Sequence, residues 1–296
     1  MDEYVLSNTC RAYAGRLAIS SLYPNRITTQ AAALRAVSVI RKRWRWLVGR
    51  LAELGWPPAK TVLHQKYLAH CPPFGVVRPK ALPLLPPTRF CLRALHCPFC
   101  YARRYAANAF DRLAPILEAK ERWRLLTTEW EKWIDAEDYP RVVDLFKAAG
   151  AVVNGPDRRL EVDVARPLGA VVFHRVRIAT RHHLVKAKDV VSGLTVVRTA
   201  VMVLPPGDYL DMVGGVRFRL TPDPTRGTLA AAVGRAFRYP QEWYDHPAEA
   251  VALGGYVAKA RPFSAFGACR QSRAAAEDAA ESEDTDLTPV GSEGDE

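Results

Sequence analysis

The sequence contains no apolar run of the roughly 18 residues that a membrane span needs. Its N-terminal stretch, MDEYVLSNTCRAYAG, begins with acidic side chains and holds no apolar segment typical of a secretory signal. We therefore expect no membrane partner and a cytoplasmic location, where thiols stay reduced. Clustered cysteines then indicate metal ligands or redox groups before structural disulfides.

Lysine and arginine are missing from the end of the chain. Residues 274–296 hold nine acidic side chains and no basic one, so we predict a disordered acidic tail over residues 266–296. The other residues carry 42 basic and 22 acidic side chains, a net charge of +20, whereas the whole chain carries +11. So basic a body favours a polyanionic partner, nucleic acid first, over a soluble protein that is merely basic.

A basic amphipathic helix is predicted over residues 27–54. Its apolar residues fall three and four apart, and its other face carries the candidate DNA-binding residues Arg41, Lys42, Arg43 and Arg45. Such a helix can lie on phosphates, on an anionic membrane or on a protein partner. A core-packed helix with a solvated basic face is the alternative. We assign residues 1–60 to this basic helical region.

Residues 61–265 are predicted to form one α+β domain. Periodicity indicates helices over residues 101–120, 139–149, 228–237 and 248–259, and strands over residues 123–130, 169–180, 193–206 and 214–222. We expect an antiparallel sheet with helices on one side, stapled by a structural zinc ion.

The zinc prediction comes from the segment FCLRALHCPFCYARR, residues 90–104. A C-x-x-C turn points the sulfurs of Cys97 and Cys100 at one place, which suits a tetrahedral ion. Cys91 can supply a third ligand. The fourth can be Cys71, His70 or His96, of which Cys71 ranks first because its HCPP context is also turn-like.

Two other readings of this segment stay open. A thioredoxin-like redox pair needs a preceding strand, a following helix and a βαβ neighbourhood, of which only the helix is predicted. The cysteines can also be incidental. Arg103 and Arg104, next to the turn, are candidate phosphate contacts, although they can equally be ordinary surface charges.

The same segment resembles the cysteine-rich segment of plasmid rolling-circle replication initiators. There a Phe-Cys pair and a basic spacer, one residue shorter than here, precede C-P-x-C, an aromatic residue and paired arginines. In that family a strand similar to L-T-L-T follows, as LLTTEW does at residues 125–130, and a helix with Tyr-x-x-Lys comes last, as in GGYVAKARPF at residues 254–263. The order of these elements over residues 71–263 carries the resemblance.

The resemblance implies HUH-endonuclease chemistry on single-stranded origin or hairpin DNA. Tyr256 would attack a phosphodiester and leave a 5′-phosphotyrosine and a free 3′-hydroxyl, which divides one hard step into two. A Mg²⁺ or Mn²⁺ ion held by two histidines would polarise the phosphate. Lys259, one helical turn from Tyr256, would steady the tyrosine or the phosphate charge.

The chain departs from the family at the histidine pair. Aligning the family's Pro-Pro turn on Pro205-Pro206 puts the expected histidines near Val197 and Thr199, neither of which can replace an imidazole ligand. His174 in the preceding strand is a candidate ligand, although a histidine among apolar neighbours is more often a core residue. Three hypotheses follow: a rebuilt nicking site that uses His174, a DNA-binding module or regulator without nicking, and a zinc-containing RNA- or DNA-binding protein outside the family.

Overall fold

A computed structural model gives the fold of the chain. It describes residues 5–6, 9–20, 38, 42, 46, 76–77, 97–118, 122–154, 167–181, 190–207, 217–240 and 262–270. Within these residues, no helix combines the length and the apolar character that crossing a membrane requires.

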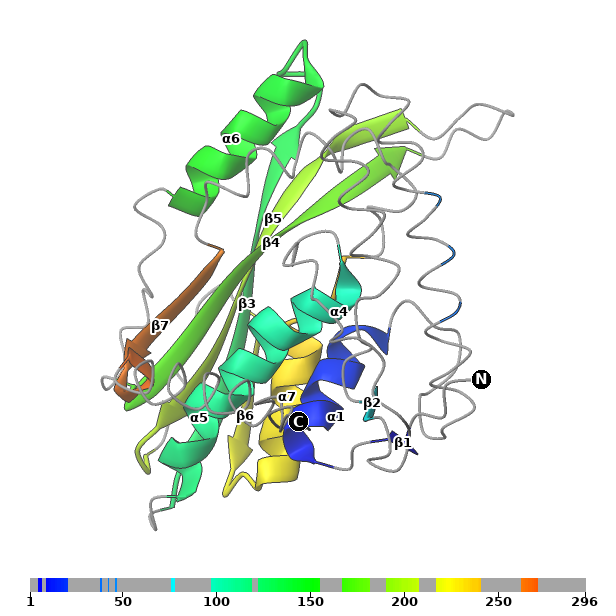
Figure 1. Cartoon of the computed structure of the whole chain (residues 1–296). Helices are drawn as coiled ribbons and strands as arrows, with labels where there is room; N and C mark the ends of the chain where they lie inside the picture. Colours follow the sequence, from blue (N-terminus) through cyan, green and yellow to red (C-terminus); the bar gives the residue numbers. More distant parts are fainter. Residues whose placement is uncertain are drawn as a thin grey trace, which may run out of the picture.

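Five strands form one antiparallel sheet in the order β6-β3-β5-β4-β7 (Figure 1). The long strands β3 (Arg124–Asp135), β5 (Val190–Leu204) and β4 (Gly169–Arg181) form its centre. The shorter β6 (Arg217–Pro222) and β7 (Phe263–Gly267) form its edges. A separate pair joins β1 (Val5–Leu6) to β2 (Val76–Val77). The prediction of an α+β domain on an antiparallel sheet is confirmed.

One face of the sheet, which we call the α5 face, is apolar along half of its length. Because side chains alternate along a strand, this face carries Leu125, Val171, Phe173, Val201 and Val203, all of them buried. The helices α1 (Cys10–Ala18), α5 (Asn108–Glu118) and α7 (Arg226–Ala236) pack together on this side. α5 is preceded by α4 (Pro98–Tyr101) and by the π-helical segment η2 (Ala102–Ala107).

The helix α6 (Val142–Asn154) lies on the opposite face, the α6 face. It contacts β5 and β3 and buries Phe146 and Val153. The α6 face is apolar at the end where the α5 face becomes polar, with Ile134, Val176, Ile178, Leu194 and Val196 all buried. The expectation of helices on one side is therefore wrong for α6, because both faces of the long strands carry buried apolar side chains. The α6 face has a second buried cluster at its other end, formed by Leu126, Ala170, Val172, Ala200, Met202 and Leu204.

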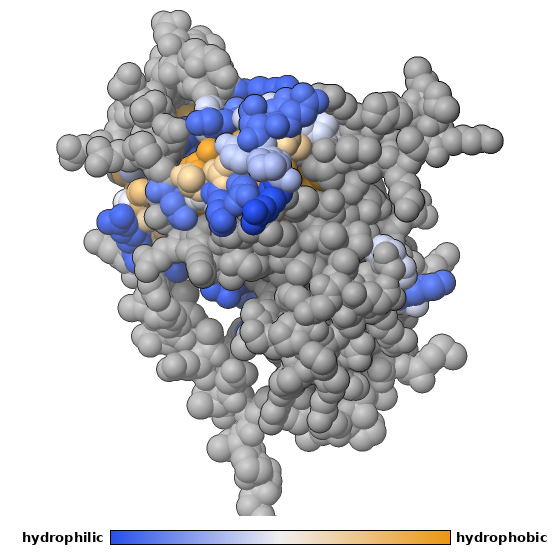
Figure 2. Space-filling view, turned by 90° about the horizontal axis from the view of Figure 1, so that it is seen from above, coloured by the Kyte–Doolittle hydropathy of each residue, from blue (hydrophilic) through white to orange (hydrophobic). Residues whose placement is uncertain are grey.

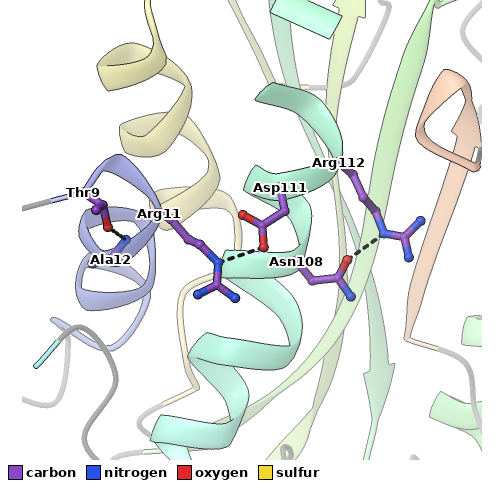
Figure 3. Close-up of polar contacts among 6 residues, drawn as sticks. All are labelled: Thr9, Arg11, Ala12, Asn108, Asp111 and Arg112. Carbon is purple, nitrogen blue, oxygen red and sulfur yellow. Dashed lines mark hydrogen bonds and ion pairs between the residues drawn. The ribbon is translucent and has the colours of Figure 1, made fainter. Parts of the chain in front are cut away.

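Contacts between helices fix α1 to the main body. The hydroxyl of Thr9 caps α1 by accepting a hydrogen bond from the Ala12 N–H, and Arg11 forms a 2.8 Å ion pair with Asp111 of α5 (Figure 3). Gly234 of α7 permits the close approach of α1, because a Cβ there would lie 2.8 Å from the Ala14 carbonyl oxygen. α1 thus packs in the core of the main body, whereas most of the predicted region over residues 1–60 lies outside the described residues.

Element boundaries differ from the predictions most clearly at α6 and at β7. α6 continues past Gly150 to Asn154 because Val153 packs in the core. β7 crosses the predicted boundary at residue 265, and Cys269 beyond it is fully buried, so a tail can begin only after residue 270. The predicted helix over 248–259 lies outside the described residues. Within residues 27–54, Ser38, Lys42 and Trp46 are described, and all three are helical and exposed.

Candidate nucleic-acid interface

Cys97 and Cys100 lie in the first turn of the long helical segment that becomes α5. Cys97 is the N-cap of α4 with an extended backbone, and Pro98 occupies the first helical position, where a missing N–H costs nothing. Both sulfur-bearing side chains are buried. The described residues hold no metal-binding group of three or more side chains, and Cys71, Cys91, His70 and His96 lie outside them. The zinc set therefore stays a prediction.

The fold bears on the redox reading of the same cysteines. A thioredoxin-like pair follows a strand of a parallel βαβ unit. Every described strand pairing is antiparallel, so the described sheet lacks the parallel neighbourhood that this reading needs.

The predicted phosphate contacts lie on η2, directly after the cysteine turn. Arg104 is exposed, and Arg103 is partly exposed. On the opposite side of this helical segment, Tyr101 at the end of α4 and Tyr105 of η2 are buried in the core. Arg104 can therefore reach a phosphate from the surface without moving the helix.

Tyr101 and Tyr105 are not candidates for a DNA-attacking nucleophile. Their rings pack edge-on at 5.0 Å and both contact Phe173. The Tyr101 hydroxyl donates a hydrogen bond to the Arg238 carbonyl oxygen. Burial raises the pKa of Tyr101 well above its ordinary value, and Arg175 opposes this only in part. Burial likewise raises the pKa of Tyr105. A tyrosine that attacks a phosphodiester needs the opposite environment.

The positions expected for the histidine pair lie on the α5 face in the central strand. Val197 and Thr199 are both buried. Arg175 of β4 and Glu129 of β3 form a 3.0 Å ion pair on this face. Because β5 lies between β3 and β4, this ion pair crosses β5 at the site where the family would hold its ion.

A second pair crosses β5 in the same direction. Arg177 of β4 lies 3.6 Å from Glu131 of β3, and both side chains are well exposed. Glu129 and Glu131 are thus each paired with a guanidinium group. A phosphate could be bound bidentately by Arg175 or Arg177 only by displacing one of these carboxylates.

His174 lies on the other face of the sheet. It stands opposite Arg198 in the β4–β5 register, and the Arg198 guanidinium carbon lies 4.8 Å from the centroid of the Trp130 ring. Its side chain is buried between Val172 and Val176 on the α6 face. The geometry argues against His174 as a ligand at Val197 and Thr199, because the sheet separates them.

The remaining predicted site residues lie outside the described part of the chain: Arg41, Arg43, Arg45, Tyr256 and Lys259. Lys42 is described and exposed. The residues that sequence reasoning missed are Glu129, Glu131, Arg175 and Arg177. Their signal was the alternation of charged residues in EWE and HRVR, which marks one face of each strand.

Comparisons with models of protein families, with curated proteins and with solved structures each found no match.

Proposed function

We propose that this chain binds single-stranded DNA in the cytoplasm, as the rolling-circle initiators that it resembles do. The observation that carries the proposal is the net charge of +20 on residues 1–273, which attracts phosphate whatever the base sequence. Arg104, exposed on η2 beside the cysteine turn, adds a candidate phosphate contact.

Two versions of this function differ in chemistry. In the first, Tyr256 nicks and joins the strand, with Lys259 beside it and Mg²⁺ or Mn²⁺ supplying Lewis-acid chemistry. In the second, the chain is a binding module or regulator that does not nick. The Arg175–Glu129 bridge favours the second version, since it places an ion pair where the first needs metal ligands.

One experiment separates the two versions. The full chain is incubated with single-stranded origin-like or hairpin DNA and Mn²⁺ or Mg²⁺, and the protein is analysed for a covalent DNA adduct. An adduct that Tyr256→Phe abolishes supports nicking. Salt-sensitive binding without an adduct supports the module, and the absence of binding at low salt contradicts both.

We also propose that a structural zinc ion is held by Cys97 and Cys100 together with Cys71 and Cys91. The position of two buried thiols in one helical turn supports this set, and thiolates are the ligands of structural zinc sites. We expect one zinc ion per chain in purified protein and its loss in Cys97→Ser. A zinc-free protein that folds normally would contradict the proposal.

A further inference from the structure

Carboxylates balance the arginines at the N-terminal end of α7. α7 begins directly after β6 ends, and α5 ends shortly before β3 begins, so these two helix ends lie at the same end of the sheet. There Arg226 forms a 2.9 Å ion pair with Glu118, and Arg124 lies 3.6 Å from Asp223. The other end of α7 lies in a different charge environment.

The C-terminal end of α7 lies beside α4 and the C-terminal end of α1 (Figure 1). The Tyr101 hydroxyl donates a 3.2 Å hydrogen bond to the Arg238 carbonyl oxygen, and the Tyr239 N–H donates a 2.7 Å hydrogen bond to the Ala18 carbonyl oxygen. The Tyr101 and Tyr239 rings pack edge-on at 5.0 Å. These contacts join three segments in one place. We call this place the arginine corner; it comprises residues 17–20, 97–107 and 233–240.

Every charged side chain of the arginine corner is an arginine. Arg104 of η2, Arg235 in the last turn of α7 and Arg238 just beyond it are all exposed. The described residues of the corner include no aspartate and no glutamate. Within these residues, carboxylates therefore do not balance the positive charge, in contrast to the N-terminal end of α7.

We propose that the arginine corner binds the backbone of single-stranded DNA, with Arg104, Arg235 and Arg238 contacting neighbouring phosphates. This proposal rests on the proposed function for its choice of DNA, and it adds the surface that holds the strand. Residues three apart on a helix are neighbours on its surface, which places Arg235 near Arg238. The Tyr101 hydrogen bond brings the backbone of Arg238 to the helical segment that carries Arg104. Guanidinium groups bind phosphate oxygens bidentately, and such contacts position a strand without reading its bases.

Burial and charge select DNA over a lipid surface or a second copy of the chain. A lipid-binding surface inserts apolar side chains beside its cations, whereas the aromatic rings of the arginine corner, among them Tyr101, Tyr105 and Tyr239, are buried. Viewed from above, hydrophilic side chains surround a smaller hydrophobic area of the described surface (Figure 2). A second copy would bring a body with the same net charge of +20 against the arginine corner. A DNA strand brings the opposite charge.

The test measures the association constant of the full chain for labelled oligothymidylate by fluorescence anisotropy across a range of salt concentrations. We expect Arg104→Gln, Arg235→Gln and Arg238→Gln each to weaken binding at low salt by about 3- to 10-fold. Each should also lower the slope of the logarithm of the constant against the logarithm of salt by about 0.7, the value for one phosphate contact. The matched control is Arg226→Gln, which removes an exposed arginine from the other end of α7 and should leave the slope unchanged. All four variants should keep the wild-type urea midpoint, because the replaced side chains are exposed.

The outcomes separate this proposal from the proposed function. Failure of the wild-type chain to bind oligothymidylate overturns both. Wild-type binding whose slope is unchanged when all three corner arginines are replaced overturns the arginine corner alone, and so does an equal loss of slope in Arg226→Gln. If the triple variant keeps DNA binding but loses binding to vesicles of anionic phospholipid, the corner is assigned to a lipid surface instead. A loss of slope confined to the corner arginines supports the proposal.

Discussion

At the scale of single residues, the centre of the α5 face is organised by two ion pairs of unequal burial. The Arg175 side chain is 11% exposed in its pair with Glu129, whereas Arg177 is 46% exposed in its pair with Glu131. A guanidinium that has lost most of its water depends on its carboxylate partner far more than an exposed one does. The Arg175–Glu129 ion pair should therefore contribute more to the free energy of unfolding than the Arg177–Glu131 ion pair does.

This difference gives a matched pair of variants. Glu129→Gln should lower the free energy of unfolding by about 1–3 kcal/mol, because it leaves the buried Arg175 without its charged acceptor. Glu131→Gln should change it by less than about 0.5–1 kcal/mol. Urea denaturation at pH 7 measures both values. Equal effects of the two variants would contradict the bridged arrangement across β5.

Tyr101 makes stability fall at alkaline pH. Burial raises the pKa of Tyr101 in the folded state above its unfolded value of about 10. The unfolded state therefore releases this proton first, so the stabilisation is complete below about pH 10 and is lost as the pH rises through the folded value. Tyr101→Phe should flatten the decline in urea midpoint between about pH 9 and 11, whereas Tyr13→Phe should follow the wild type. A decline of the same slope in Tyr101→Phe would refute this assignment.

At the scale of elements, the long strands support helices on opposite faces at their two ends. β3, β4 and β5 turn apolar side chains toward α5 and α7 at one end and toward α6 at the other. α6 thus covers the end of these strands that lies beyond the pairings with β6 and β7, where Ile134, Val176 and Leu194 are buried.

A variant on α6 tests that support. Phe146→Ala should lower the free energy of unfolding by about 3–5 kcal/mol, because the ring is 1% exposed and its loss leaves a cavity. Lys147→Ala, the next residue, should change it by less than about 0.5 kcal/mol, because its ion pair with Asp144 is exposed. Thermal or urea unfolding of the two variants gives the comparison. A small effect of Phe146→Ala would contradict the burial of α6 against the sheet.

Periodicity predicted most strands and helices because their burial is regular. His174 among Val172, Val176 and Ile178 shows this, since the alternation correctly placed it on one face. β7 was not predicted from the sequence. Its five residues mix small and aromatic side chains, so they show no clear alternation of apolar and polar positions. The Arg175–Glu129 ion pair could not be predicted from the sequence. The two residues lie 46 positions apart in the chain, and they meet only because of the register in which β3 and β4 pair with β5.

At the scale of the whole molecule, charge is divided between a basic body and an acidic C-terminal segment. The body carries +20, and residues 274–296 carry nine acidic side chains. Under the proposed function, such a segment would compete with DNA phosphates for the basic surface. The net charge of +11 would then understate the attraction of the body for DNA.

Removal of residues 274–296 should strengthen the binding of single-stranded DNA at low salt, because the competing carboxylates are gone. The effect should shrink as salt rises, since added ions screen both the tail and the DNA. Anisotropy titrations of the full and shortened chains in parallel measure it. Replacing the same nine acidic residues by Gln and Asn should have the same effect, and an unchanged affinity in both variants would contradict the competition.

Binding of single-stranded DNA by the arginine-rich body, as proposed, can be tested by one measurement. The equilibrium association constant of the full chain for oligothymidylate is determined across a range of salt concentrations. We expect tight binding at low salt, with the logarithm of the constant falling linearly with the logarithm of salt by about 0.7 for each phosphate contacted. No measurable binding at low salt, or an affinity that salt does not change, would contradict it.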